Sequence, residues 1–81
     1  MSKTRDIIEE VVLELTGEKE VDHSTNLFDA GLLTSVDSLD MLAQLETKFD
    51  LSVPDEELTI ENFGTIDGMV LLVDRLRGAG N

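Results

Sequence analysis

Residues 26–41 read NLFDAGLLTSVDSLDM, and within this stretch a loop turns into an amphipathic helix. From about Ser35 to Phe49, apolar residues recur at three- and four-residue steps, which is typical of a helix with one face on a core. Thr34, with Asp37 three residues later, resembles a capping box that uses Asp for the usual Glu. We therefore predict a helix that starts at Ser35. Its inward stripe is expected to consist of Leu39, Leu42, Leu45 and Phe49.

Two further segments carry the same helical periodicity. The first lies near the N-terminus, where Thr4 is a candidate cap and Thr16-Gly17 a candidate stop. The other runs from about Ile66 to Leu76, with Thr65 as its candidate cap. The residues expected to face the core are Ile7, Ile8, Val11, Val12 and Leu15 in the first helix, and Met69, Val70, Val73 and Leu76 in the last.

The connections between these helices complete the expected fold. A long loop, residues 17–34, precedes the helix at Ser35; Leu27, Phe28 and Leu32 are expected to pin it to the core. Pro54 separates that helix from residues 55–63, which we expect to form a single small helix. No segment alternates as a strand does. The sequence thus predicts an all-α four-helix bundle with a long loop between helices 1 and 2 and a short third helix.

The length of 81 residues fits one domain over residues 1–81. We place its core at about residues 4–77. Gly78 and Gly80 are expected to begin a short flexible C-terminal tail.

Charge is distributed unevenly along the chain, whose formal net charge is −12. Fourteen of the 18 acidic residues lie in residues 14–67, with only Lys19 and Lys48 as bases there. Such a surface repels nucleic acid and anionic membranes and attracts basic protein patches. Solubility alone is the other interpretation of the charge.

The chain has no cysteine, and no apolar run approaches the length of a membrane span. Its N-terminal residues lack the apolar stretch of a signal peptide. These features predict a cytoplasmic protein without a membrane span.

The sequence offers little catalytic or metal chemistry. His23 is the single histidine and is expected to be a solvated loop residue, because no nucleophile or orienting group lies near it in sequence. A calcium loop that starts at Asp22 fails, because Leu27 occupies its glycine position and Leu33 its final glutamate position. We expect no catalytic residue and no metal site.

Residues 26–50, followed by 53–58 (VPDEEL), resemble the carrier-protein superfamily. Its hallmark is a serine that opens the second helix, commonly within Asp-Ser-Leu, and is modified by phosphopantetheine. The LFDAGLL stretch at residues 27–33 is similar to discrete carriers related to D-alanyl carrier proteins. Residues 58–66 (LTIENFGTI) are more similar to carriers of polyketide extender units such as methoxymalonyl. The resemblance implies the acyl carrier type of four-helix bundle and a covalent 4′-phosphopantetheine cofactor.

Two serines compete for that role. Ser38 stands in the literal motif, within Asp37-Ser38-Leu39-Asp40. In the family, however, buried apolar residues follow the modified serine at about +4, +7, +10 and +14. Counted from Ser35 these positions are all apolar, whereas from Ser38 the last two are Lys48 and Ser52. We therefore predict attachment at Ser35, with Ser38 as the alternative.

The surroundings of Ser35 fit this assignment with one departure. A helix start favours a phosphodiester through its N–H groups and dipole, and Gly31 gives the approach loop conformational freedom. The residue before the modified serine is usually Asp in the family but is Thr34 here. This difference makes selectivity among modifying transferases an open point.

The resemblance also implies partners and the surface that they contact. The partner-facing side of the second helix would comprise Val36, Asp37, Asp40, Ala43 and Thr47. Expected partners are a phosphopantetheinyl transferase, an acyl- or aminoacyl-loading ligase or transferase, and a downstream synthase. The carrier, expected to be a monomer, would hold an acyl or aminoacyl thioester for fatty-acid-like, polyketide or nonribosomal peptide biosynthesis. The competing class is an unmodified acidic helical interaction module, in which Ser35 is only part of a helix start.

Overall fold

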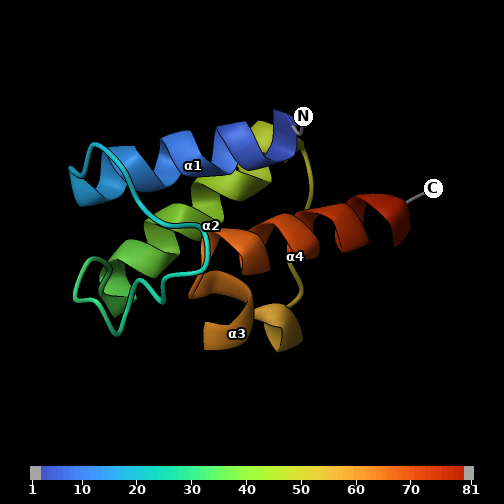
Figure 1. Cartoon of the computed structure of the whole chain (residues 1–81). Coiled ribbons are helices and arrows are strands. Elements are labelled where there is room, and N and C mark those ends of the chain that lie inside the picture. Colours follow the sequence, from blue (N-terminus) through green and yellow to red (C-terminus); the bar gives the residue numbers. More distant parts are fainter. Residues whose placement is uncertain (1–2, 80–81) are drawn as a thin grey trace.

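The structure, a computed structural model, describes residues 3–79, and within that range it contains helices and no strand. In chain order the elements are α1 (Lys3–Thr16), α2 (Ser35–Phe49), a 3₁₀ turn η1 (Asp55–Glu57), α3 (Ile60–Phe63) and α4 (Ile66–Ala79). Figure 1 shows α1 lying across α2 and α4, with α3 below α4. The predicted all-α fold, with its long first loop and short third helix, is confirmed.

The start of α2 follows directly from local side-chain chemistry. Thr34 has extended backbone angles, and its hydroxyl oxygen accepts the Asp37 N–H at 3.2 Å. The Asp37 carboxylate in turn accepts the Thr34 backbone N–H at 3.0 Å. This reciprocal pair is the predicted capping box, and α2 has the predicted bounds.

The other helix ends were only partly predictable. Thr65 caps α4 as expected, since its hydroxyl accepts the Gly68 N–H at 2.8 Å. Gly17 follows the end of α1 with a φ of +75°, as expected of a helix stop. The prediction that Thr4 caps α1 is wrong: Thr4 lies inside the helix and is only 8% exposed.

The segment after Pro54 forms two short pieces, so the prediction of a single small helix over residues 55–63 is wrong. Thr59 interrupts it with extended backbone angles (φ −123°, ψ 159°), and its hydroxyl accepts the Asn62 N–H. α4 continues through Gly78 to Ala79, past the end predicted at Leu76. Gly78 is therefore helical, and Gly80 lies outside the described residues.

The core is drawn from every long helix and from the first loop. Leu45 of α2 is fully buried as predicted, but Leu39 is 66% exposed. Met41 takes the expected place of Leu39 in the core, because Leu39 lies about 120° around the helix from Leu45 and Met41 only about 40°. The largest fully buried side chains are Ile8, Val11, Val12, Leu27, Met41, Leu45, Ile66, Met69, Leu72 and Val73.

The loop at residues 17–34 is held firmly despite its length. Leu27 is fully buried as predicted, and its N–H donates to the Gly64 carbonyl at 2.6 Å. Phe28 and Leu32 are half-buried against the core, and Leu33, which was not expected to pin the loop, is buried as well. The loop therefore delivers the chain to Ser35 in a fixed position. No helix among residues 3–79 is long and apolar enough to cross a membrane.

Candidate functional site

Ser35 occupies the first position of α2 and is exposed. Gly31, with a φ of +76°, provides the turn that leads to the cap at Thr34. A side chain at this position lies beside the positive end of the helix dipole, which favours an attached phosphodiester. The predicted residue thus stands where a modifying enzyme could reach it.

Ser38 is in a different situation. It is half-buried one turn into α2, and its hydroxyl donates a hydrogen bond to the Ser35 carbonyl at 2.6 Å. This hydrogen bond to the helix backbone occupies the Ser38 hydroxyl and restricts the side chain to one rotamer. The two serines therefore differ in the exposure of the residue, and the Ser38 hydroxyl is bonded to the helix backbone.

A pocket of about 380 Å³ opens beside both serines, between α2 and the η1–α3 segment. Its walls are mostly apolar, and the exposed side of Leu39 is one of them. This pocket could not be predicted from the sequence, because residues 43–57 separate its two main walls in the chain. The lining residues are Phe28, Ser35, Ser38, Leu39, Leu42, Leu58, Thr59, Ile60 and Phe63.

The five residues predicted to face partners differ in their surroundings. Val36 is 75% exposed, and Asp40, Ala43 and Thr47 are also exposed. Asp37 is only half-exposed, and one of its carboxylate oxygens accepts both the N–H and the hydroxyl of Thr34. Asp37 therefore has a structural role that the partner prediction did not include.

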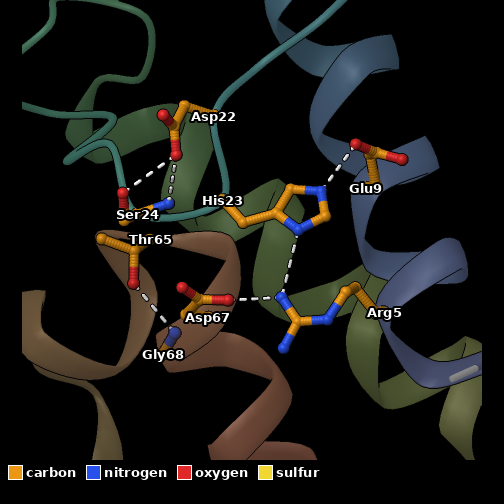
Figure 2. A network of polar contacts seen from close by, with 8 residues as sticks. All are labelled: Arg5, Glu9, Asp22, His23, Ser24, Thr65, Asp67 and Gly68. Atoms are coloured by element: carbon orange, nitrogen blue, oxygen red, sulfur yellow. Dashed lines mark hydrogen bonds and ion pairs between the residues drawn. The ribbon is translucent and has the colours of Figure 1, made fainter. Parts of the chain in front are cut away.

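His23 belongs to a polar network, so the expectation of a solvated loop residue is wrong. Figure 2 shows it between α1 and the start of α4. Its Nε2–H donates to Glu9 at 2.7 Å, and its Nδ1 accepts from the Arg5 guanidinium at 3.1 Å. Arg5 also pairs with Asp67, whose N–H donates to the His23 carbonyl. Partners this distant in sequence give no local signal.

Asp22 precedes His23 in the loop at residues 17–34. The Ser24 backbone N–H, followed by the Ser24 hydroxyl, lowers the pKa of the Asp22 carboxyl from its ordinary value. Figure 2 shows both hydrogen bonds, each 2.9 Å long. Among residues 3–79 no group of His, Asp and Glu side chains is arranged to hold a metal ion.

An all-α fold with a long first loop and an exposed serine at the start of α2 is compatible with a phosphopantetheine-dependent carrier. The chain matches the family described as "Phosphopantetheine attachment site" over residues 6–73, and it belongs to that family. It is 36% identical to the D-alanyl carrier protein of Lactobacillus acidophilus over 74 residues, covering 90% of this chain and 94% of that one. The D-alanyl carrier protein of Streptococcus sanguinis is 34% identical, with 91% and 90% covered.

A solved structure agrees with these sequence relatives. The carrier protein bound to glycine:[carrier protein] ligase of Bradyrhizobium japonicum superposes with a TM-score of 0.82 and 28% identity. The match covers 91% of this chain and 99% of that one. The curated D-alanyl carrier relatives confirm the resemblance that residues 27–33 indicated.

Membership of the family establishes the general activity. The chain is a carrier protein with a covalently attached 4′-phosphopantetheine, and it holds its cargo as a thioester without catalysing a reaction itself. The surroundings of Ser35 fit phosphopantetheine, because they offer an exposed serine at a helix start beside an apolar pocket.

Proposed function

We propose that Ser35 is the residue that carries the phosphopantetheine arm and that the cargo is an aminoacyl group. The observation that carries the assignment is the contrast between the two serines. Ser35 is exposed at the first position of α2, whereas the Ser38 hydroxyl is bonded to the Ser35 carbonyl. The competing idea, an unmodified interaction module, leaves the family match without a function.

Attachment of the arm requires one phosphoryl transfer. The Ser35 Oγ forms a bond to the phosphorus of coenzyme A that bears pantetheine, and the P–O bond to adenosine 3′,5′-bisphosphate breaks. The serine proton passes to a base of the transferase. This chain contributes the position of the hydroxyl, which the capping box of Thr34 and Asp37 fixes.

Loading of the arm follows as an acyl transfer. A phosphopantetheine held on Ser35 would supply a terminal thiol, which could accept the aminoacyl group of a ligase-held aminoacyl adenylate as a thioester, with AMP as the leaving group. Support for an aminoacyl cargo comes from the relatives, which are D-alanyl carriers and a carrier seen with an analogue of glycyl adenylate. A downstream synthase or transferase would then receive the group.

The exposed side of α2 is the proposed contact surface for these enzymes. Val36 offers apolar area, and Asp40 offers negative charge close to Ser35. Weak, electrostatically steered contacts suit a carrier that must leave each partner again. We further propose that the protein acts as a monomer in the cytoplasm, where coenzyme A is available.

Intact mass spectrometry after incubation with coenzyme A and a broad-specificity transferase tests the assignment. Wild type and Ser38→Ala should each gain the mass of one phosphopantetheine, and Ser35→Ala should gain none. Ser38→Ala is the matched control, because it removes a hydroxyl three residues away. Modification of Ser35→Ala together with loss of modification in Ser38→Ala would contradict the proposal.

A further inference from the structure

A second groove lies at the end of the molecule away from Ser35. It has a volume of about 290 Å³ and is formed by the start of α1 and the ends of α2 and α4. Since α2 spans about 21 Å from Ser35 to Phe49, an occupant here would not block the arm. The lining residues are Lys3, Thr4, Ile7, Lys48, Phe49, Asp50 and Arg77.

The groove gathers positive charge on a strongly acidic chain. Half of the six basic residues line it, namely Lys3, Lys48 and Arg77, against the single carboxylate of Asp50. The chain as a whole has a formal net charge of −12. A local excess of cations is therefore the opposite of what the composition leads one to expect.

These cations are not used in ion pairs within the described chain. The three ion pairs among residues 3–79 join Arg5 to Asp67, His23 to Glu9, and Arg75 to Glu57. Lys48 and Arg77 do stand in the last turns of their helices, where a positive charge stabilises the helix dipole. That role leaves the Lys48 ammonium, and the Arg77 N–H groups other than the one near Thr4, available to a ligand.

Arg77 is held in place by its surroundings. Its guanidinium lies over the Phe49 ring, 5.8 Å from the centroid, and one N–H approaches the Thr4 hydroxyl oxygen at 3.5 Å. A guanidinium fixed in this way loses less conformational entropy when it binds an anion. Ile7 and Phe49 add half-buried apolar surface to the same groove.

We propose that this groove binds the phosphate group of a phosphorylated small molecule. A guanidinium and two ammonium groups supply the donors that phosphate oxygens accept, and three positive charges match a di- or polyanion better than one carboxylate. Ile7 and Phe49 would contact the apolar part of the ligand. The site does not depend on the modification of Ser35.

Titration of the full-length, unmodified protein with inorganic phosphate and pyrophosphate, followed by NMR, tests this site. Sodium chloride is exchanged to hold ionic strength constant, so that general screening does not move the signals. We expect saturable shifts at Lys3, Thr4, Lys48, Phe49 and Arg77, with pyrophosphate binding more tightly than phosphate.

Variants separate the groove from a general charge effect. Lys48→Gln and Arg77→Gln should each weaken pyrophosphate binding by about five- to tenfold. Lys19→Gln removes the same charge from an exposed residue outside the groove and should leave binding unchanged. Thermal unfolding of each variant checks that the fold is retained.

Three outcomes would overturn the proposal: the absence of saturable shifts, an equal loss of binding in Lys19→Gln, or tighter binding of an oligoglutamate peptide than of pyrophosphate. The last result would assign the groove to an acidic protein segment instead. None of these outcomes bears on whether Ser35 carries the arm.

Discussion

At the scale of single residues, Asp37 combines a role in the helix cap with a predicted role in partner contact. The family resemblance suggests a partner contact, whereas the structure shows its carboxylate bound to the N–H and hydroxyl of Thr34. Both roles use the same negative charge near the start of α2, where the helix dipole favours it. Measurements of stability and of partner recognition can separate them.

Replacement of Asp37 by Ala should lower the free energy of unfolding by about 1 kcal/mol, because it removes the acceptor of the capping box. Asp40→Ala is the matched control: it removes the same charge from an exposed position of α2 that takes no part in the cap. Urea unfolding of both variants measures the difference. Equal stability of the two variants would show that the box contributes nothing.

Asp22 gives a second prediction for a single residue, this time one that depends on pH. Its pKa is lowered in the folded state, chiefly by the Ser24 backbone N–H, so its hydrogen bonds stabilise the fold above the ordinary carboxyl pKa. This contribution should be lost as pH falls below about 4 and through the lowered value. NMR titration of the Asp22 carboxyl should show a midpoint below the ordinary value for an aspartate carboxyl.

The control for this titration is Ser24→Ala, which removes the hydroxyl but keeps the backbone N–H. It should raise the Asp22 midpoint only part of the way to the ordinary value, because the backbone bond is the larger cause. An unchanged midpoint in this variant would mean that the hydroxyl does not stabilise the carboxylate.

At the scale of elements, the contact between α3 and α4 depends on a glycine. A Cβ built at Gly68 would lie 2.5 Å from the Glu61 carbonyl oxygen and 3.2 Å from that of Asn62. Backbone atoms cannot move aside as a side chain can, so α3 would have to shift. Since α3 forms one wall of the pocket beside Ser35, this contact also shapes the site.

Gly68→Ala should therefore destabilise the protein by about 1–3 kcal/mol, despite the better helix propensity of Ala. Gly78→Ala provides the matched control within the same helix, since a Cβ there meets nothing within 4 Å. That variant should be unchanged or slightly more stable. Thermal unfolding of the pair measures both effects, and a stable Gly68→Ala would show that α3 yields without cost.

Several features of the helices could be predicted from the sequence. The bounds of α2, its capping box and the Thr65 cap were predictable, because each depends on residues within four positions of one another. The assignment of Leu39 to the core was wrong. A broad apolar stripe on a helix does not reveal which side of the stripe packs against another element, and Leu39 lies on the side that lines the pocket.

For the candidate site, the sequence predicts only the proposed attachment residue, Ser35. Ser35 could be singled out by its place at a helix start and by the spacing of the apolar residues that follow. The opposite wall of the pocket, near Ile60, lies far from Ser35 in the sequence. The hydrogen bonds of His23 to Glu9 and Arg5 likewise join residues that are distant in the sequence. Such contacts are set by how the elements pack, and single-sequence periodicity does not encode that.

At the scale of the whole molecule, acidic and basic residues are unevenly placed along the chain. Acidic residues accompany Ser35 and α2, whereas Lys3, Lys48 and Arg77 line the groove at the far end of that helix. A basic partner is therefore expected to attract the Ser35 end of the carrier and to orient it during encounter.

Arm transfer by a transferase with a basic surface should accordingly slow as ionic strength rises. The expected change is a fall in kcat/KM, through KM, and Asp40→Asn should reduce the slope of this salt dependence. Asp74→Asn, which removes the same charge from an exposed position in the second half of α4, serves as the control and should leave the slope nearly unchanged. A rate independent of salt would argue against electrostatic steering.

The central claim is that the wild-type protein carries its arm on Ser35. Proteolysis of the modified wild-type protein, followed by fragmentation mass spectrometry of the peptide that contains both serines, locates the group directly and without any substitution. We expect phosphopantetheine on Ser35 with Ser38 unmodified. Phosphopantetheine found on Ser38, with Ser35 unmodified, would contradict it.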